Sequence, residues 1–170
     1  MRLLQFAGEA ARNTSVCAYN CSFIAPEKVQ DFGEVMYVCM CGTGVGFAVE
    51  SKNIQKFPQI EMQTGEKLPI HLIDDSKEGW CDALALGLKT WFSGKDIEFD
   101  YSKLRPAGAR LKTFGGKSSG PEPLRNLLDF ARAKILKRQG RRLTNVDAHD
   151  ILCKIGEVVV SGVVRRSAMI

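Results

Sequence analysis

The stretch "DSKEGWCDALALGLKTWF", residues 75–92, has the spacing of an amphipathic helix. Its large apolar side chains recur at helical intervals and would form one stripe: Trp80, Leu84, Leu88 and Trp91. Asp75 is followed three residues later by Glu78, the pattern of a capping box, which predicts where the helix begins. This stretch therefore predicts a helix that faces a core.

Three further stretches, residues 31–41, 121–140 and 144–160, also have helical spacing. In the second, two prolines stand in the first turn and Gly140 ends the helix. Its expected inward-facing residues are Leu124, Leu127, Leu128, Ala131 and Ile135. Thr144 or Asn145 is expected near the cap of the third.

Strands are predicted between these helices. Residues 16–24, 45–50 and 96–102 are rich in β-branched and aromatic residues or alternate in hydropathy, and a last strand is expected after a glycine turn at Ser161 and Gly162. Residues 51–73 have a weak pattern and are expected to be an irregular insertion. Strands that alternate with helices predict parallel α/β units. A final strand with no helix after it suggests the first part of a larger domain.

Composition restricts the class of protein. The chain has 170 residues, of which 45% are hydrophobic and 25% charged, as in a soluble globular domain. No apolar run is long enough to cross a membrane or to act as a signal peptide, so a cytoplasmic location is expected. The six cysteines are therefore expected to be thiols, and their spacing, with two isolated histidines, predicts no metal site.

The net charge of +5 is concentrated in "RAKILKRQGRR", residues 132–142. Such a stretch can contact nucleic acid or phosphate. No aromatic residue is interleaved with these charges, so a solvated helix face is favoured and no nucleic-acid partner is expected.

Two glycine-rich motifs resemble nucleotide-binding loops but match neither consensus. "GTGVGF", residues 42–47, has Phe47 in place of the third glycine and lies between a helix and a strand, the reverse of the Rossmann order. "FGGKSSGP", residues 114–121, lacks the first glycine of a Walker A loop, because Leu111 stands there. Cys21, in the first strand, could be a small core residue or a redox thiol.

Several segments taken together resemble one family. They are "YNCSFIAP" (19–26), "GTGVGFAVE" (42–50), "KEGW" (77–80), "LRPAGARLKTFGGKSSGPEPL" (104–124) and "GRRLTNVDAHDILCKIGEVVVSGVVRRSA" (140–168). In this order they resemble the adenosylcobalamin-dependent, class II ribonucleotide reductases, especially the monomeric ribonucleoside-triphosphate type. The resemblance covers nearly the whole chain.

The resemblance implies a fold and a chemistry. The family's fold is a ten-stranded α/β barrel made of two five-stranded parallel halves, and residues 1–170 would be roughly the first half-barrel. The family replaces the ribose 2′-hydroxyl with hydrogen by thiyl-radical chemistry, while two further thiols are oxidised to a disulfide. The implied cofactor is adenosylcobalamin, and the implied partners are a ribonucleotide substrate, a deoxynucleotide effector and a thioredoxin-like reductant.

The resemblance also assigns residues. Cys21 matches the reducing cysteine of the first strand, with Ser22 beside it. Gly42, Gly44 and Gly46 match the turn that brings backbone against the substrate. The segment from Ser161 and Gly162 to Arg165 and Arg166 matches the loop between effector and substrate bases, and Arg165 is the first candidate for the key contact. The principal phosphate motif would lie elsewhere, so "FGGKSSGP" is expected to be a packed turn.

Other family motifs are absent from these 170 residues: the N-x-C-G-E finger loop, the second reducing cysteine, the P-S-G-T phosphate motif, the C-terminal cysteine pair and most of the cobalamin site. The chain is therefore expected to be part of a reductase, inactive alone and completed by a C-terminal chain. The alternatives are a free-standing nucleotide-binding or regulatory module and a truncated remnant without function. The sequence leaves open whether diphosphates or triphosphates are reduced.

Overall fold

The computed structural model describes residue 12, residues 14–110 and residues 117–162. Its elements in chain order are the 3-10 helix η1 (Ser15–Ala18), β1 (Cys21–Ile24), α3 (Asp31–Met40), β2 (Gly44–Phe47), α4 (Ser51–Ile54), β3 (His71–Leu72), α5 (Lys77–Phe92), β4 (Phe99–Asp100), α6 (Glu122–Leu136) and α7 (Asn145–Gly162).

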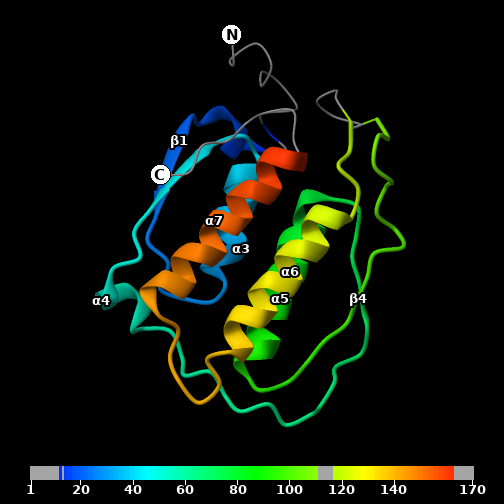
Figure 1. Ribbon diagram of the computed structural model, residues 1–170. Coiled ribbons are helices and arrows are strands. Elements are labelled where there is room, and N and C mark those ends of the chain that lie inside the picture. The colour runs from blue at the N-terminus through cyan, green and yellow to red at the C-terminus, as the bar shows by residue number, and fades with distance from the viewer. Residues whose placement is uncertain (1–11, 13, 111–116, 163–170) are drawn as a thin grey trace.

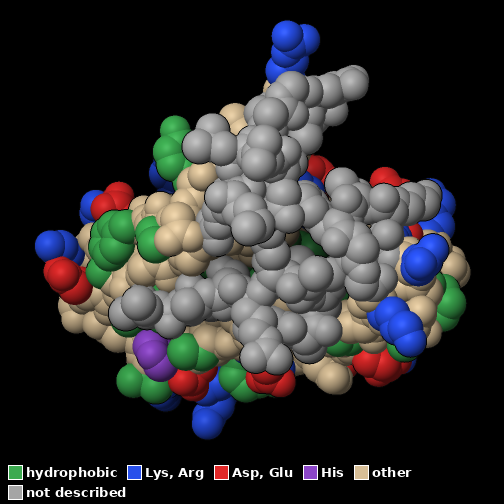
Figure 2. All heavy atoms as spheres, turned by 90° about the horizontal axis from the view of Figure 1, so that it is seen from above, with side chains coloured by type: hydrophobic (Ala, Val, Ile, Leu, Met, Phe, Trp, Pro, Cys, Tyr) green, Lys and Arg blue, Asp and Glu red, His purple; other side chains and the backbone are tan. Residues whose placement is uncertain are grey.

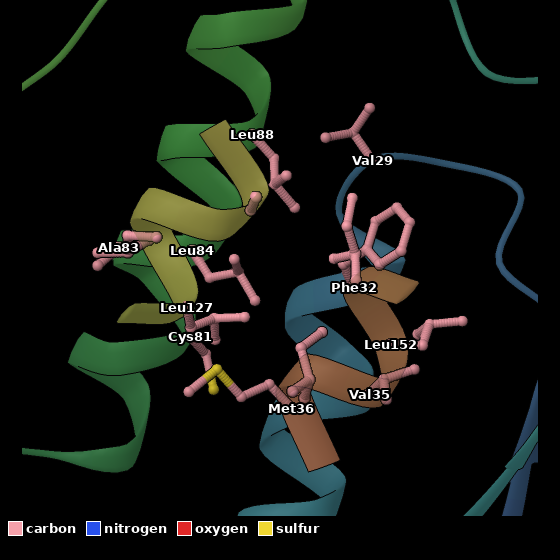
Figure 3. Close-up of a cluster of buried hydrophobic side chains, with 14 of the residues drawn as sticks. Val29, Phe32, Val35, Met36, Cys81, Ala83, Leu84, Leu88, Leu127 and Leu152 are labelled. Carbon is pink, nitrogen blue, oxygen red and sulfur yellow. The ribbon is translucent and has the colours of Figure 1, made fainter. Parts of the chain in front are cut away.

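Four helices occupy the centre of the molecule (Figure 1). α3 packs on α5, α5 on α6, α6 on α7 and α7 on α3, so each helix has two helical neighbours around one core. Figure 3 shows part of this core, where side chains from all four helices meet: Val35, Met36, Leu84, Leu88, Leu127 and Leu152. All six are buried, so the burial of apolar side chains between helices is the main stabilising term of the fold.

The inward-facing residues predicted for the helix between the two prolines and Gly140 are confirmed. α6 buries the five predicted residues and no others: Leu124, Leu127, Leu128, Ala131 and Ile135. Pro123 lies in its first turn, where the missing N–H costs no helical hydrogen bond. The helix ends at Leu136, four residues before Gly140, whose φ of +71° suits the following turn.

The two helix caps differ in how well the sequence predicted them. The expected Asp75–Glu78 capping box is wrong: Ser76 caps α5, and its hydroxyl accepts a hydrogen bond of 3.0 Å from the Gly79 N–H. Thr144 caps α7 as expected. Its hydroxyl accepts from the Asp147 N–H at 3.2 Å, and the Asp147 carboxylate accepts from the Thr144 N–H at 3.3 Å.

The strands are shorter than predicted. In the segment 16–24, η1 comes first and the strand begins only at Cys21. The strand expected at 45–50 is β2, which begins at Gly44 and ends at Phe47. In the segment 96–102, only Phe99–Asp100 is a strand. β1 pairs with β2 and β3 with β4, both in parallel. The described residues thus combine a helical core with two parallel strand pairs, and a five-stranded half-barrel stays a prediction.

Two segments between these elements were also predicted. Residues 51–73 contain α4 and β3 and are otherwise irregular; the limits of an insertion stay a prediction. The glycine turn expected at Ser161 and Gly162 is wrong, because α7 continues through both residues. A glycine inside a helix costs about 1 kcal/mol relative to alanine, which the packing of the rest of α7 can offset. The strand expected next lies outside the described residues.

The basic stretch at residues 132–142 is more engaged than a solvated face would be. Arg132 binds Asp96 through two hydrogen bonds of 2.9 and 2.6 Å. Lys134 lies 2.5 Å from Asp150, and Arg138 lies 2.7 Å from the buried Asp147. These cations therefore join α6 to α7 and to the segment before β4. None of the helices in the described residues combines the length and apolar composition that a membrane crossing needs.

The Asp96–Arg132 pair predicts an acid-sensitive contribution to stability. Hydrogen bonding to Arg132 lowers the pKa of Asp96 below its ordinary 3.8, although partial burial opposes this. Because the folded-state pKa is the lower one, the contribution is present above about pH 4 and is lost as the pH falls through the depressed value. Asp96→Asn should therefore flatten the dependence of the unfolding free energy on pH below 4, measured by urea unfolding.

Glu98→Gln is the matched control, since Glu98 forms an exposed ion pair with Lys67 at 2.7 Å. Exposed pairs contribute little, so this variant should keep the wild-type pH dependence. Equal slopes for wild type and Asp96→Asn would show that the Asp96 pair does not contribute in this way.

Candidate functional site

The β1–β2 pair brings Cys21 against the glycine segment. In the parallel register Cys21 lies opposite Gly44, and Phe23 lies opposite Gly46. Residues directly opposite each other point to the same face of a sheet. One face of the pair therefore carries Cys21, Phe23 and two glycines.

The other face of the pair points to the core. Ser22 and Ile24 alternate with the exposed residues of β1, and Val45 of β2 is 1% exposed. α3 packs on β2, and the Phe47 ring lies 5.9 Å from the His149 ring of α7. The helices of the described residues thus cover the Val45 face of the pair, and Cys21 stands on the opposite face.

The immediate surroundings of Cys21 are polar. Its side chain is exposed, and the Asn20 amide donates a hydrogen bond of 3.5 Å to the sulfur. The hydroxyl of Ser22 donates to the Gly44 carbonyl at 3.2 Å, which ties the two strands together beside Cys21. Ser22 is therefore better placed to hold the strands in register than to reach a ligand on the Cys21 face.

The glycine segment is held at both ends. Gly42 has a φ of +82°, and its N–H donates to the Cys39 carbonyl at 2.9 Å, which ends α3 in a tight turn. The Gly44 N–H donates to the Asn20 carbonyl at 2.9 Å. The hydroxyl of the buried Thr43 lies 3.1 Å from the Val16 carbonyl and 3.0 Å from that of Tyr19. The sequence did not single out Thr43, because these partners lie more than 20 residues away.

A buried pair of thiols lies beneath this turn. Cys17 and Cys41 pack together at 2% and 4% exposure, and the Lys77 ammonium donates to the Cys41 sulfur at 3.6 Å. Burial raises the pKa of Cys41 to about 11, although Lys77 opposes the shift. The Cys41 thiol therefore stays protonated and unreactive at neutral pH. The pair therefore holds η1 against the end of α3 and leaves Cys21 as the accessible thiol of this region.

The remaining predicted site residues lie elsewhere. Ser161 and Gly162 are the last described residues of α7, and Arg165 and Arg166 lie outside the described residues. Of the "FGGKSSGP" loop, the described part contains the Ser118 hydroxyl, which accepts from the Gly120 N–H at 3.0 Å. This local bond agrees with a packed turn rather than with an open phosphate cradle.

The described residues contain no group of three or more histidine, cysteine or acidic side chains arranged to hold a metal ion. A cavity of about 340 Å³ lies between Val29, Lys56 and Phe92, and its size suits a small ligand. A corrin ring is larger than this cavity, so the cavity by itself would not enclose adenosylcobalamin.

Comparison with known proteins gives a consistent result. The family model "B12-dependent ribonucleotide reductase, insertion domain" matches residues 48–135, just over half of the chain. The adenosylcobalamin-dependent ribonucleoside-triphosphate reductase of Euglena gracilis is 37% identical over 89% of this chain and 21% of its own length. The enzyme of the same name from Lactobacillus leichmannii is 30% identical over 92% of this chain and 29% of its own length.

A solved structure also matches. A crystal structure of a B12-dependent, class II ribonucleotide reductase superposes with a TM-score of 0.76 at 25% identity, over 99% of this chain and 30% of that chain. The described helices and strands thus have a counterpart in a class II reductase. This chain belongs to the B12-dependent ribonucleotide reductase family. It spans less than a third of the length of each of these relatives.

Proposed function

We propose that this chain forms part of the substrate site of an adenosylcobalamin-dependent ribonucleotide reductase and supplies Cys21 as one of its two reducing thiols. The observation that carries the proposal is the position of Cys21, exposed beside Gly44 on the face of the strand pair opposite the described helices. Family membership supports the reaction, and the geometry supports this residue.

The reaction requires two thiols. The ribose 2′ C–O bond breaks, a C–H bond forms in its place and the oxygen leaves as water. Two thiols lose two electrons and two protons and become one disulfide, which an external dithiol then reduces. Cys21 would be one of the pair, and its partner would come from the part of the enzyme that this chain does not span.

The glycine segment would bring backbone close to the substrate. Gly44 and Gly46 present no side chain on the Cys21 face, so a sugar can approach the sulfur without a steric barrier. The turn at Gly42 and the hydrogen bonds of Thr43 hold this backbone in place before any ligand binds. Such preorganisation lowers the entropic cost of positioning a substrate.

The remaining parts of the enzyme would come from outside this chain. Because the relatives are three to five times longer, we place the cofactor site, the radical cysteine and the rest of the ten-stranded barrel in a complementing chain or polypeptide segment. Arg165, with Arg166 as the alternative, would contact the base of a deoxynucleotide effector beyond the end of α7. The isolated chain should therefore bind nucleotide weakly and catalyse no turnover. The complete enzyme would work in the cytoplasm, with a thioredoxin-like protein as its reductant.

Thiol protection tests the assignment of Cys21. Ribonucleoside triphosphate at millimolar concentration should slow the alkylation of Cys21 by iodoacetamide several-fold, because a bound sugar covers the sulfur. Peptide mass spectrometry reads the rate at each cysteine. Cys153 is the internal control, since it is also exposed but lies on α7.

The buried cysteines should react slowly in every sample, which verifies that the chain is folded. If every ribonucleotide leaves the Cys21 rate unchanged, or slows Cys153 to the same extent, Cys21 does not lie at a nucleotide site and the proposal fails.

A further inference from the structure

Phe23 is the large apolar side chain on the Cys21 face of the strand pair. It is 67% exposed, although phenylalanine in a strand is usually buried. It follows Cys21 by two residues and therefore points to the same side. An aromatic ring left in water beside a candidate redox thiol needs a reason.

The surroundings of Phe23 distinguish between two kinds of occupant. Opposite the ring lies Gly46, and the neighbouring pair is Cys21 and Gly44, so within the strand pair this face carries one aromatic ring among small residues. An apolar protein segment would require a broader apolar patch to bind stably. A flat molecule with polar edges requires only one ring on which to stack, and glycine opposite leaves room for it.

The spacing along the strand indicates which part of a nucleotide reaches the ring. Two residues of strand separate the Cα atoms of Cys21 and Phe23 by roughly 7 Å. If the sulfur faces the 2′ carbon of a ribose, the base lies a few bonds away on the neighbouring ring carbon. The base is then the part of the ligand that can extend along β1 over Phe23.

We infer that Phe23 positions the substrate by stacking on its base, with Gly44 and Gly46 as the floor of the subsite. The inference rests on the proposed role of Cys21. Every base has a π face, so stacking holds all four ribonucleotides alike and does not select among them. Phe23 would therefore increase the affinity for every ribonucleotide, and other residues would select among the bases.

The test extends the thiol-protection measurement to variants of Phe23. In Phe23→Ala, half-maximal protection of Cys21 should require about tenfold more ribonucleotide than in wild type. The increase should be similar for all four bases. Phe23→Tyr, which keeps an aromatic ring, should retain the wild-type value. Ribose 5-triphosphate, which has no base, should protect wild type and Phe23→Ala at the same concentration.

Ile70→Ala is the matched control, because Ile70 is 65% exposed and lies next to β3 rather than β1. It should leave protection unchanged, and thermal melts should show that each variant is folded. Protection of wild type and Phe23→Ala at equal nucleotide concentrations would overturn the role of Phe23 and leave that of Cys21 standing. Absence of protection in wild type would overturn both. A loss that is equally large with ribose 5-triphosphate would show that the ring does not contact the base.

Discussion

Replacing Cys21 by serine is expected to abolish repeated turnover in the assembled reductase, with a dithiol as the only reductant. A hydroxyl cannot be oxidised to a disulfide, so no electron pair reaches the ribose from this position. Serine is close in size to cysteine, and the side chain is exposed, so the fold should not change. Product formed per enzyme under excess substrate measures the effect.

Two controls separate chemistry from structure in this experiment. Cys153→Ser removes the other exposed thiol of the described residues and should keep wild-type turnover. Nucleotide binding and the thermal melt of Cys21→Ser should stay close to those of wild type. Normal multiple turnover in the Cys21→Ser enzyme would show that this thiol is not a reducing residue.

The second large effect is on stability and concerns Gly94, directly after α5. Its φ of +71° lies in the left-handed region, and an added Cβ would lie 2.4 Å from the carbonyl oxygen of Met62. The conformation costs an ordinary residue about 1–2 kcal/mol and the clash roughly 1–3 kcal/mol more. Gly94→Ala is therefore expected to lower the free energy of unfolding by about 2–5 kcal/mol, measured by urea unfolding.

Gly65→Ala is the matched control for this clash. Gly65 has nearly the same φ, +79°, but an added Cβ would meet no atom within 4 Å. It should lose only the conformational part, about 1–2 kcal/mol. Equal losses in both variants would mean that the contact between the Gly94 turn and Met62 relaxes without cost.

The helices could be predicted from the sequence because their pattern is local. The five buried residues of α6 follow from their spacing alone, since a helix with one apolar stripe has one way to face a core. The cap of α5 was misplaced by one residue for a reason outside the local sequence. The Asp75 carboxylate is bound by Arg105 at 2.7 Å, and this leaves Ser76 to cap the helix.

The strands and the site depend on contacts that a single sequence does not show. Nothing in the residues themselves reveals that Cys21 lies opposite Gly44, or that Thr43 anchors the turn to residues before β1. Cys21 became a candidate through the resemblance to a family, and its role stays a proposal. Phe23 was missed, because an aromatic residue in a strand normally indicates a core position. Only the structure reveals that its side chain is 67% exposed.

The distribution of charge on the surface also could not be predicted from the sequence. Acidic and basic side chains are interspersed around the edge of the face in Figure 2, although the sequence concentrates its positive charge in one stretch. Much of that stretch is paired with carboxylates distant in sequence, as Arg132 is with Asp96. A net charge of +5 therefore does not by itself indicate a nucleic-acid surface on this chain.

The most direct test of the central claim is to locate the disulfide formed by a single round of reduction. The assembled enzyme is given ribonucleotide without external reductant, quenched in acid, alkylated and mapped by peptide mass spectrometry. The account predicts that Cys21 is recovered in a disulfide, in an amount equal to the deoxyribonucleotide formed, while Cys153 is recovered alkylated. Recovery of Cys21 as an alkylated thiol alongside a full equivalent of product would contradict it.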